Sequence, residues 1–285
     1  MSSDHEDFEG YTFLDCGEGR RLERFGEYLL DRQSPQSFWP RDPACAEWEA
    51  ERAIFERRGK GGGDWGGTPL PERFEIAGEG LRFLLKPTDF GHLGFFPEHL
   101  THCRFAAARL GARPSPGRLL NLFGYTGALS LYAARAGAAV THVDASRGVV
   151  GWARDNAQHN GVQGIRWITD DVLKYVKREV KRKSVYEAIV LDPPSFGRGA
   201  QGQVFKLERD LPLLLEQCLA LLSDAANFLL VSCHTPGVTP SSLSNLLGPL
   251  VADRGGAVAG GEMLLRAKVS RNALPSGTFA RWVAM

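Results

Sequence analysis

The sequence lacks the marks of a disulfide-rich, zinc-binding or membrane-spanning protein. Its five cysteines are an odd number, lie far apart and form no CxxC or Cys/His pair at zinc spacing, so we expect reduced thiols and no metal site. No apolar run approaches the roughly 18 residues of a membrane span. The N-terminus is acidic and polar. We therefore expect no signal peptide, no membrane contact and a cytoplasmic location.

The chain also lacks an excess of charge of either sign. Its 34 lysines and arginines nearly balance 33 aspartates and glutamates, for a formal net charge of +1. Contact with a polyanion would have to come from a local basic patch. The hydrophobic content of 43% over 285 residues supports one large globular domain with a modest N-terminal addition.

The N-terminal part shows mixed and interrupted patterns. We expect a disordered tail over residues 1–10 and a β-rich or α+β region over 11–110. Short apolar runs predict hairpin strands between 11 and 39, and helices are expected over 46–58 and 97–110. The segment 57–71, with a glycine-rich loop at 59–67, is predicted to lack regular structure, and alternation returns over 74–96.

From residue 116 to 285, strand and helix patterns alternate, which is typical of βαβ units and a parallel sheet. Strands are expected near 118–123, 138–143, 165–169, 186–192, 227–232, 257–268 and 278–284. Helices are expected near 127–136, 147–159, 172–183, 207–222 and 240–252. The last two strands are joined only by a loop, so they predict an antiparallel hairpin. The fold class is therefore α/β, Rossmann-like, with a mostly parallel seven-stranded sheet.

One short motif says most about function. The apolar run 188–191 ends at Asp192, which Pro193, Pro194, Ser195 and Phe196 follow. Proline offers no N–H to a sheet, so the buried strand must stop there. Loops at the carboxyl ends of parallel strands line the ligand crevice of an open α/β sheet. With the glycine turn about seventy residues earlier, this loop points to methyl transfer from S-adenosylmethionine.

That turn, 121–127, joins a strand to a helix of small residues and lets backbone approach a ligand at a helix N-terminus. It has two glycines and is not GxGxxG, which suits the compact methionine part of S-adenosylmethionine better than a dinucleotide. Asp144, roughly 20 residues later, can accept both ribose hydroxyls. Asp171 can meet the adenine amino group, although Asp170 competes and either acid can simply cap a helix. The predicted cofactor-binding residues are Phe123, Gly124, Tyr125, Thr126, Gly127, Asp144, Ala145, Asp171, Val172 and Asp192.

Several motifs in order carry a resemblance. They are NLFGYTG (121–127), VDAS (143–146), DDVL (170–173), DPPSF (192–196), SCHTPG (232–237) and LPSGTFARWVAM (274–285). Together they resemble the bacterial large-subunit ribosomal RNA cytosine-C5 methyltransferases, from about Leu81 to the C-terminus. The resemblance implies a class I methyltransferase fold, S-adenosylmethionine as donor, ribosomal RNA as substrate and a catalytic cysteine at Cys233. GFFPEH (94–99) is similar to the segment that covers the cofactor, but it has Pro97, Glu98 and His99 where that family has an acid-Gln-Arg run. No PUA domain is recognisable in residues 1–75.

The expected catalytic pair is Cys233, which the resemblance implies, and Asp192, whose position would let it hydrogen-bond the base. Carbon 5 of cytosine is too weak a nucleophile to attack a sulfonium methyl, so a thiolate must first add to carbon 6. Cys233 ends a strand beside the one that ends at Asp192, so both side chains are expected to face one crevice. His234 is the adjacent group that would lower the thiol pKa. Alternatively, Cys233 is a small, inert, buried residue.

Two other functions remain open. The loop can hold a planar amine. Asp192 and the carbonyls of Pro193 and Pro194 would accept hydrogen bonds from the amine, and Phe196 would stack on its ring. That reading predicts N-methylation, without need of the cysteine. In either case the loop 197–206 can fold over a flipped base, and the expected substrate contacts are Pro193, Pro194, Phe196, Arg198 and Lys206. The second alternative is a nucleotide-binding module without enzymatic activity.

Overall fold

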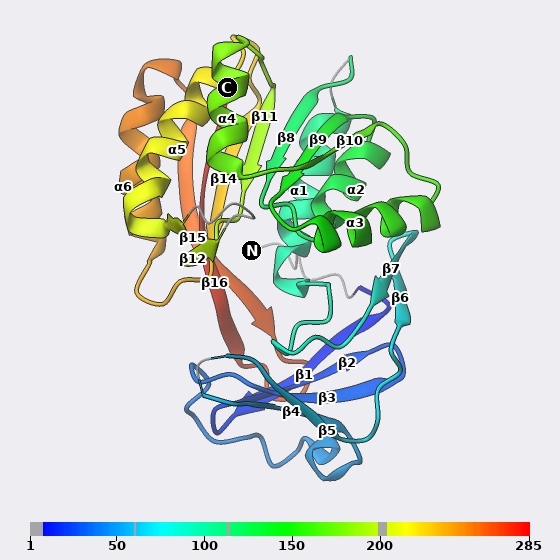
Figure 1. Cartoon of the computed structure of the whole chain (residues 1–285). Coiled ribbons are helices and arrows are strands. Elements are labelled where there is room, and N and C mark those ends of the chain that lie inside the picture. The colour runs from blue at the N-terminus through cyan, green and yellow to red at the C-terminus, as the bar shows by residue number, and fades with distance from the viewer. Residues whose placement is uncertain (1–7, 60, 113–114, 199–203) are drawn as a thin grey trace. The chain divides into compact units, whose positions relative to one another are not determined.

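The computed structural model describes residues 8–59, 61–112, 115–198 and 204–285. The chain forms two compact units, one of residues up to Glu98 together with Leu264–Pro275, the other of His99–Met263 with Ser276–Met285. Figure 1 labels their helices and strands. Within the described residues, no helix is both long and apolar enough to cross a bilayer.

The second unit is built on a seven-stranded sheet in the order β10-β9-β8-β11-β14-β16-β15. Five strands are parallel: β8 (Arg118–Leu122), β9 (Ala139–Asp144), β10 (Ile165–Thr169), β11 (Ala188–Leu191) and β14 (Phe228–Cys233). β16 (Ala273–Val283) runs antiparallel to β14 and pairs with the edge strand β15 (Ala257–Arg266). The predicted class I methyltransferase sheet with its C-terminal hairpin is thus confirmed.

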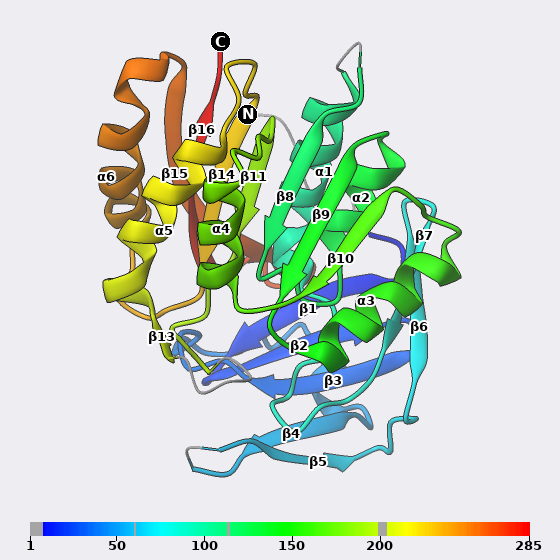
Figure 2. The same cartoon turned by 45° about the horizontal axis from the view of Figure 1, so that its top comes forward.

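Helices cover both faces of this sheet (Figures 1 and 2). On one face lie α1 (Leu100–Gly111), α2 (Ala128–Arg135) and α3 (Arg147–His159), and on the other α4 (Val172–Lys181), α5 (Leu207–Leu221) and α6 (Pro240–Val251). The main core fills the space between the sheet and α4, α5 and α6, and its buried residues include Ile189, Leu191, Leu229 and Val231. Strand order reverses between β8 and β11, which is where open α/β sheets bind ligands.

The first unit holds a five-stranded sheet in the order β1-β2-β3-β4-β5 and a separate hairpin. Its strands are β1 (Tyr11–Gly17), β2 (Arg20–Phe25), β3 (Tyr28–Gln33), β4 (Ala53–Arg57) and β5 (Gly63–Gly67), and the hairpin is β6 (Phe74–Gly78) with β7 (Leu81–Leu85). Of the tail expected to be disordered over 1–10, residues 1–7 lie outside the described part of the chain, and Phe8 is buried at 2% exposure.

Two predictions for this unit were wrong. The helix expected over 46–58 is a 3-10 turn, η1 (Ala46–Glu49), followed by β4, whose Ala53 and Phe55 are buried in strand alternation. The glycine-rich segment contains β5, which pairs antiparallel with β4. A Cβ on Gly63 would lie 2.2 Å from the Glu56 carbonyl oxygen, so these glycines permit close strand contact.

The compact units also divide the chain elsewhere than at the expected linker near residue 116. α1 packs on α2, and the Arg109 side chain donates to Asn227 Oδ1 at 2.7 Å, which ties this helix to the second unit. Conversely, the backbone N–H groups of Lys268 and Val269 donate to the carbonyls of Phe13 and Leu14 in the first unit. The boundary therefore follows packing that the linker composition does not reveal.

Candidate active site

The turn between β8 and α2 is held in an unusual backbone conformation. Phe123 and Tyr125 have φ of 56° and 50°, and Gly127, the N-cap of α2, has φ of 90°. Gly124 donates its N–H to the Val143 carbonyl at 3.1 Å. These contacts fix the turn against β9 and leave the first N–H groups of α2 directed out of the helix, an arrangement suited to an anionic ligand group.

Asp144 ends β9 beside this turn. Its carboxylate accepts the Tyr125 N–H at 3.1 Å and the Ser146 N–H at 2.9 Å. Burial raises the pKa of Asp144, although the backbone N–H groups of Ser146, Tyr125 and Ala145 act to lower it. Each carboxylate oxygen has two acceptor positions, so the group keeps capacity for a ligand hydroxyl.

Asp171 is the N-cap of α4. Its Oδ1 accepts the Lys174 N–H at 2.9 Å, and Val172 beside it is buried at 3% exposure. Its rival Asp170 contacts Arg178 and accepts the Asp171 N–H at 2.8 Å. The capping role considered for this pair therefore falls to Asp171, and Asp170 has a cationic partner.

The loop after β11 leaves the sheet at Asp192, as its prolines predict. Pro193 is buried, Pro194 is exposed and Phe196 is 51% exposed. β12 (Phe196–Arg198) pairs with β13 (Val204–Lys206). Lys206 is exposed and its N–H donates to Asp210, whereas the Arg198 side chain and residues 199–203 lie outside the described part of the chain.

The side chain of Cys233 does not lie in one crevice with Asp192, as the sequence had led us to expect. Successive side chains of a strand point to opposite faces, and Cys233 lies with Val231 in the core under α5 and α6. Its exposure is 0%, and its Sγ accepts the Thr235 N–H at 3.3 Å. Burial raises the pKa of the thiol despite the hydrogen bonds from Thr235. In this conformation the thiol is protonated and closed to substrate.

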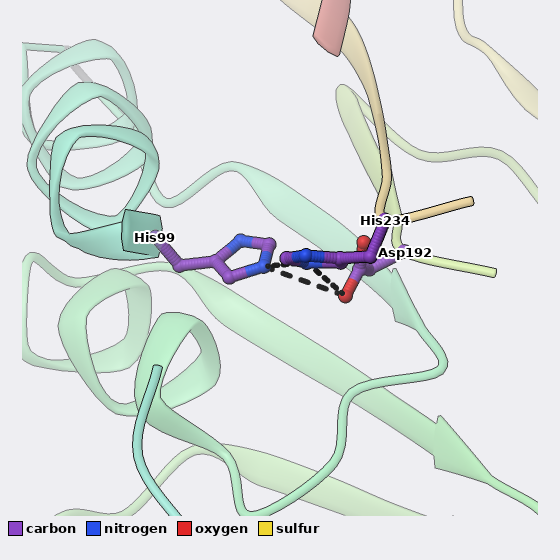
Figure 3. A group of neighbouring side chains, drawn as sticks. All are labelled: His99, Asp192 and His234. Atoms are coloured by element: carbon purple, nitrogen blue, oxygen red, sulfur yellow. Dashed lines mark hydrogen bonds and ion pairs between the residues drawn. The ribbon is translucent and has the colours of Figure 1, made fainter. Parts of the chain in front are cut away.

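The neighbours of Cys233 face the other way and meet Asp192. Ser232 donates its hydroxyl to Asp192 Oδ1 at 2.7 Å. His234 Nε2 lies 3.6 Å and His99 Nε2 3.4 Å from Asp192 Oδ2 (Figure 3). Burial alone would raise the pKa of Asp192, but His99, His234 and Ser232 outweigh it and hold that pKa well below its usual range. The result is an ionised carboxylate at the end of β11.

The sequence singled out Asp192 but missed its partners His99 and Ser232. His99 ends the 3-10 turn η2 (Pro97–His99) and is the N-cap of α1, far from Asp192 in the chain. His234, expected to act on the thiol, points instead at Asp192 and His99, and its Nδ1 lies 2.7 Å from the Ser276 carbonyl oxygen. The one available signal for His99 was its departure from the acid-Gln-Arg run.

Comparisons with known proteins identify the family of this chain. A family profile described as S-adenosylmethionine-dependent methyltransferase matches residues 43–246. The chain is 35% identical to a solved structure, the SAM-dependent methyltransferase from Agrobacterium tumefaciens, with a TM-score of 0.94 over 98% of this chain and 92% of that one.

Curated relatives match a shorter stretch. Ribosomal RNA large subunit methyltransferase K/L of Shewanella baltica is 34% identical over 148 residues, 50% of this chain and 20% of the relative. Ribosomal RNA large subunit methyltransferase K of Neisseria meningitidis serogroup B is 30% identical over 173 residues, 59% of this chain and 45% of the relative. The chain thus spans less than half the length of either relative.

Proposed function

The chain belongs to the S-adenosylmethionine-dependent methyltransferase family, and from that premise we propose that it methylates a base of large-subunit ribosomal RNA. S-Adenosylmethionine is the methyl donor of this family. The RNA substrate is supported by the names of the two curated relatives, both of which are large-subunit ribosomal RNA methyltransferases. Since the chain covers only part of those relatives, the substrate is a proposal for this protein.

The cofactor cradle in this proposal runs along the carboxyl ends of β8, β9 and β10. The turn from Phe123 to Gly127, with the N–H groups of α2, would hold the methionine carboxylate. Asp144, with Ala145 beside it, would accept the ribose hydroxyls, for which its oxygens retain acceptor capacity. Asp171 and Val172 would border the adenine, where the second oxygen of Asp171 remains for the amino group because capping uses only Oδ1.

The target atom that the geometry favours is a planar amine nitrogen of the base. The observation that carries this choice is the ionised Asp192 carboxylate, whose side chain is 29% exposed, in a loop where Phe196 is 51% exposed. Asp192 and the Pro193 or Pro194 carbonyls would accept the amine hydrogens while Phe196 stacks on the ring. Those hydrogen bonds would hold the amine in one orientation and leave its nitrogen lone pair available to the methyl donor.

The transfer then balances without a covalent enzyme intermediate. The nitrogen lone pair forms the new N–C bond, the S–C bond breaks and S-adenosylhomocysteine leaves. The nitrogen loses one proton to water. Because the pKa of Asp192 is held well below its usual range, its carboxylate serves as a hydrogen-bond acceptor and not as the final base.

Methylation of cytosine C5 through Cys233 stays a competing prediction, supported by the resemblance of the motifs. It requires the thiol to reach the base and ionise, and therefore to leave the core position where it is 0% exposed and its pKa is raised. A rotation about its side chain alone would not bring it to the face occupied by Ser232 and His234.

The two targets separate in one experiment. Methyl transfer from labelled S-adenosylmethionine to large-subunit ribosomal RNA from cells lacking the protein is measured, with mass spectrometry of the methylated nucleoside. We expect Asp192→Asn to lower the rate by about 100-fold or more, because the base loses its anchor. We expect Cys233→Ala to keep the wild-type rate, as should Cys218→Ala, which removes another fully buried thiol.

Loss of turnover in Cys233→Ala, with Cys218→Ala active and both folded, would transfer the assignment to cytosine C5. A product identified as 5-methylcytidine would do the same. If no RNA accepts the label while the enzyme binds S-adenosylmethionine, the RNA substrate is wrong.

A further inference from the structure

Three side chains from separate elements bring their ligand atoms together. The Nε2 atoms of His99 and His234 are 3.0 Å apart, and they lie 3.4 Å and 3.6 Å from Asp192 Oδ2. Figure 3 shows all three side chains pointing toward one another. His99 is the N-cap of α1, and Asp192 and His234 directly follow β11 and β14. Two imidazoles and a carboxylate form a ligand set of catalytic zinc sites.

The spacing of these atoms matches one face of a coordination tetrahedron. Zinc bonds to imidazole nitrogen and carboxylate oxygen are about 2.0 to 2.2 Å, which places neighbouring ligand atoms about 3.3 to 3.5 Å apart. The three distances of 3.0, 3.4 and 3.6 Å lie around that value. We propose that His99, Asp192 and His234 bind a divalent transition-metal ion of the zinc type, with the fourth position left for water or a substrate atom.

Hydrogen bonds outside the triangle orient the ligands for this role. The Nδ1 of His234 lies 2.7 Å from the Ser276 carbonyl oxygen, which can only accept, so the proton sits on Nδ1 and Nε2 presents its lone pair. Ser232 donates to Asp192 Oδ1 at 2.7 Å and leaves Oδ2 for the ion. Such outer partners, a carbonyl on a histidine and a donor on a carboxylate, are typical of metal ligands.

Two of the ligands follow paired strands of the sheet, and all three side chains are partly exposed to solvent. Asp192 and His234 each follow the last residue of adjacent parallel strands, paired as Leu191 with Val231. The side chains of His99, Asp192 and His234 keep exposures of 15%, 29% and 36%, so an ion can enter. Zinc is favoured over magnesium or calcium because two of the three ligands are imidazoles.

This inference goes beyond the proposed function. The ion would use Asp192 Oδ2, the oxygen that is also suited to the base amine. The ion and the base would therefore compete for the same carboxylate. The two proposals therefore need separate readouts. Metal binding is measured with neither S-adenosylmethionine nor RNA, and methyl transfer is measured in the presence of a chelator.

The test titrates Zn²⁺ and Co²⁺ into the full chain after chelation, by calorimetry and by the visible absorption of four-coordinate Co²⁺. We expect one equivalent to bind, and each of His99→Gln, His234→Gln and Asp192→Asn to weaken binding by more than about 100-fold. Ser232→Ala, which removes only an outer partner, is expected to cost about 10- to 100-fold. His159→Gln, an exposed histidine at the end of α3, should bind as the wild type does.

Absence of one-equivalent binding, or equal affinity in the ligand variants and in His159→Gln, overturns the proposal. Should a ligand variant fail to fold, X-ray absorption of the zinc-loaded wild type decides, because the proposal requires two imidazole nitrogens and a carboxylate oxygen in the first coordination sphere.

Discussion

The buried imidazole of His142 contributes to the acid sensitivity of the second unit. His142 in β9 is 0% exposed, its Nδ1 lies 3.0 Å from Ser130 Oγ, and its ring packs 4.8 Å from Trp167. Burial lowers the pKa of His142 to about 3, against the opposing effect of the Tyr125 backbone. Because the folded pKa lies below the unfolded one, protonation favours the unfolded state. Stability is full above about pH 6.5 and falls as the pH drops from there toward 3.

Replacing His142 should remove part of that dependence. We expect the wild-type free energy of unfolding to fall by about 2 to 3 kcal/mol more than that of His142→Gln between pH 7 and pH 4.5, as measured by urea unfolding. His102, whose pKa burial likewise lowers to about 3, titrates in both proteins and cancels. NMR titration of the His142 ring is the independent check. A ring that titrates near 6.5 in the folded protein would contradict this account.

At the scale of residues, the sequence indicates the acidic site residues more clearly than the side chains that contact them. Asp144 and Asp192 could be predicted because each ends an apolar strand at the crevice edge. The face that Cys233 occupies could not, since a one-residue shift in where β14 ends exchanges the two faces. The proposed metal ligands His99, Asp192 and His234 could not be predicted, because their spacing in the sequence matches no metal-binding motif and only the fold brings them together.

At the scale of elements, the turn into α2 requires a glycine at its last position. Gly127 has φ of 90°, and a Cβ there would lie 3.1 Å from Ala153 Cβ. We expect Gly127→Ala to lower the free energy of unfolding by about 1 to 2 kcal/mol. Displacing the N–H groups of α2 should also weaken S-adenosylmethionine binding about tenfold, as measured by calorimetry.

The matched control lies on the next helix. Gly151 is inside α3, and a Cβ there would meet nothing within 4 Å. Gly151→Ala should raise the free energy of unfolding by about 0.5 to 1 kcal/mol and leave cofactor affinity unchanged. If both variants bind S-adenosylmethionine equally well, the turn does not hold the cofactor.

Elements with a strong period were predicted well, and elements stabilised by partners were not. Apart from the short β12 and β13, which were not predicted, the strands and helices from β8 to α6 lie close to their predicted ranges, because apolar runs and caps such as Ser146 and Asp171 mark them locally. β4 and β5 could not be found this way. β5 is nearly all small or polar residues, and its pairing with β4 depends on close backbone contact that local propensity does not report.

Over the whole molecule, the chain enters its first unit twice, which local patterns could not reveal. Residues Leu264–Pro275 belong to that unit, although they are the end of β15, the connecting loop and the start of β16. There the N–H groups of Lys268 and Val269 donate at 2.8 and 3.1 Å to carbonyls of the edge strand β1. Val269 also packs against a small core formed by Leu14, Leu22, Leu29, Cys45 and Trp48.

A fragment of residues 1–98 should therefore be less stable than the complete first unit and should self-associate. Without 264–275 it loses two backbone hydrogen bonds and the Val269 contact, which together contribute about 2 to 3 kcal/mol. It also leaves the edge of β1 unpaired, a template for association between copies. Urea unfolding and sedimentation should show the bare fragment to be less stable and self-associating, while the same fragment joined to 264–275 by a flexible linker is monomeric. Equal stability of the two fragments would mean that the first unit folds from its N-terminal residues alone.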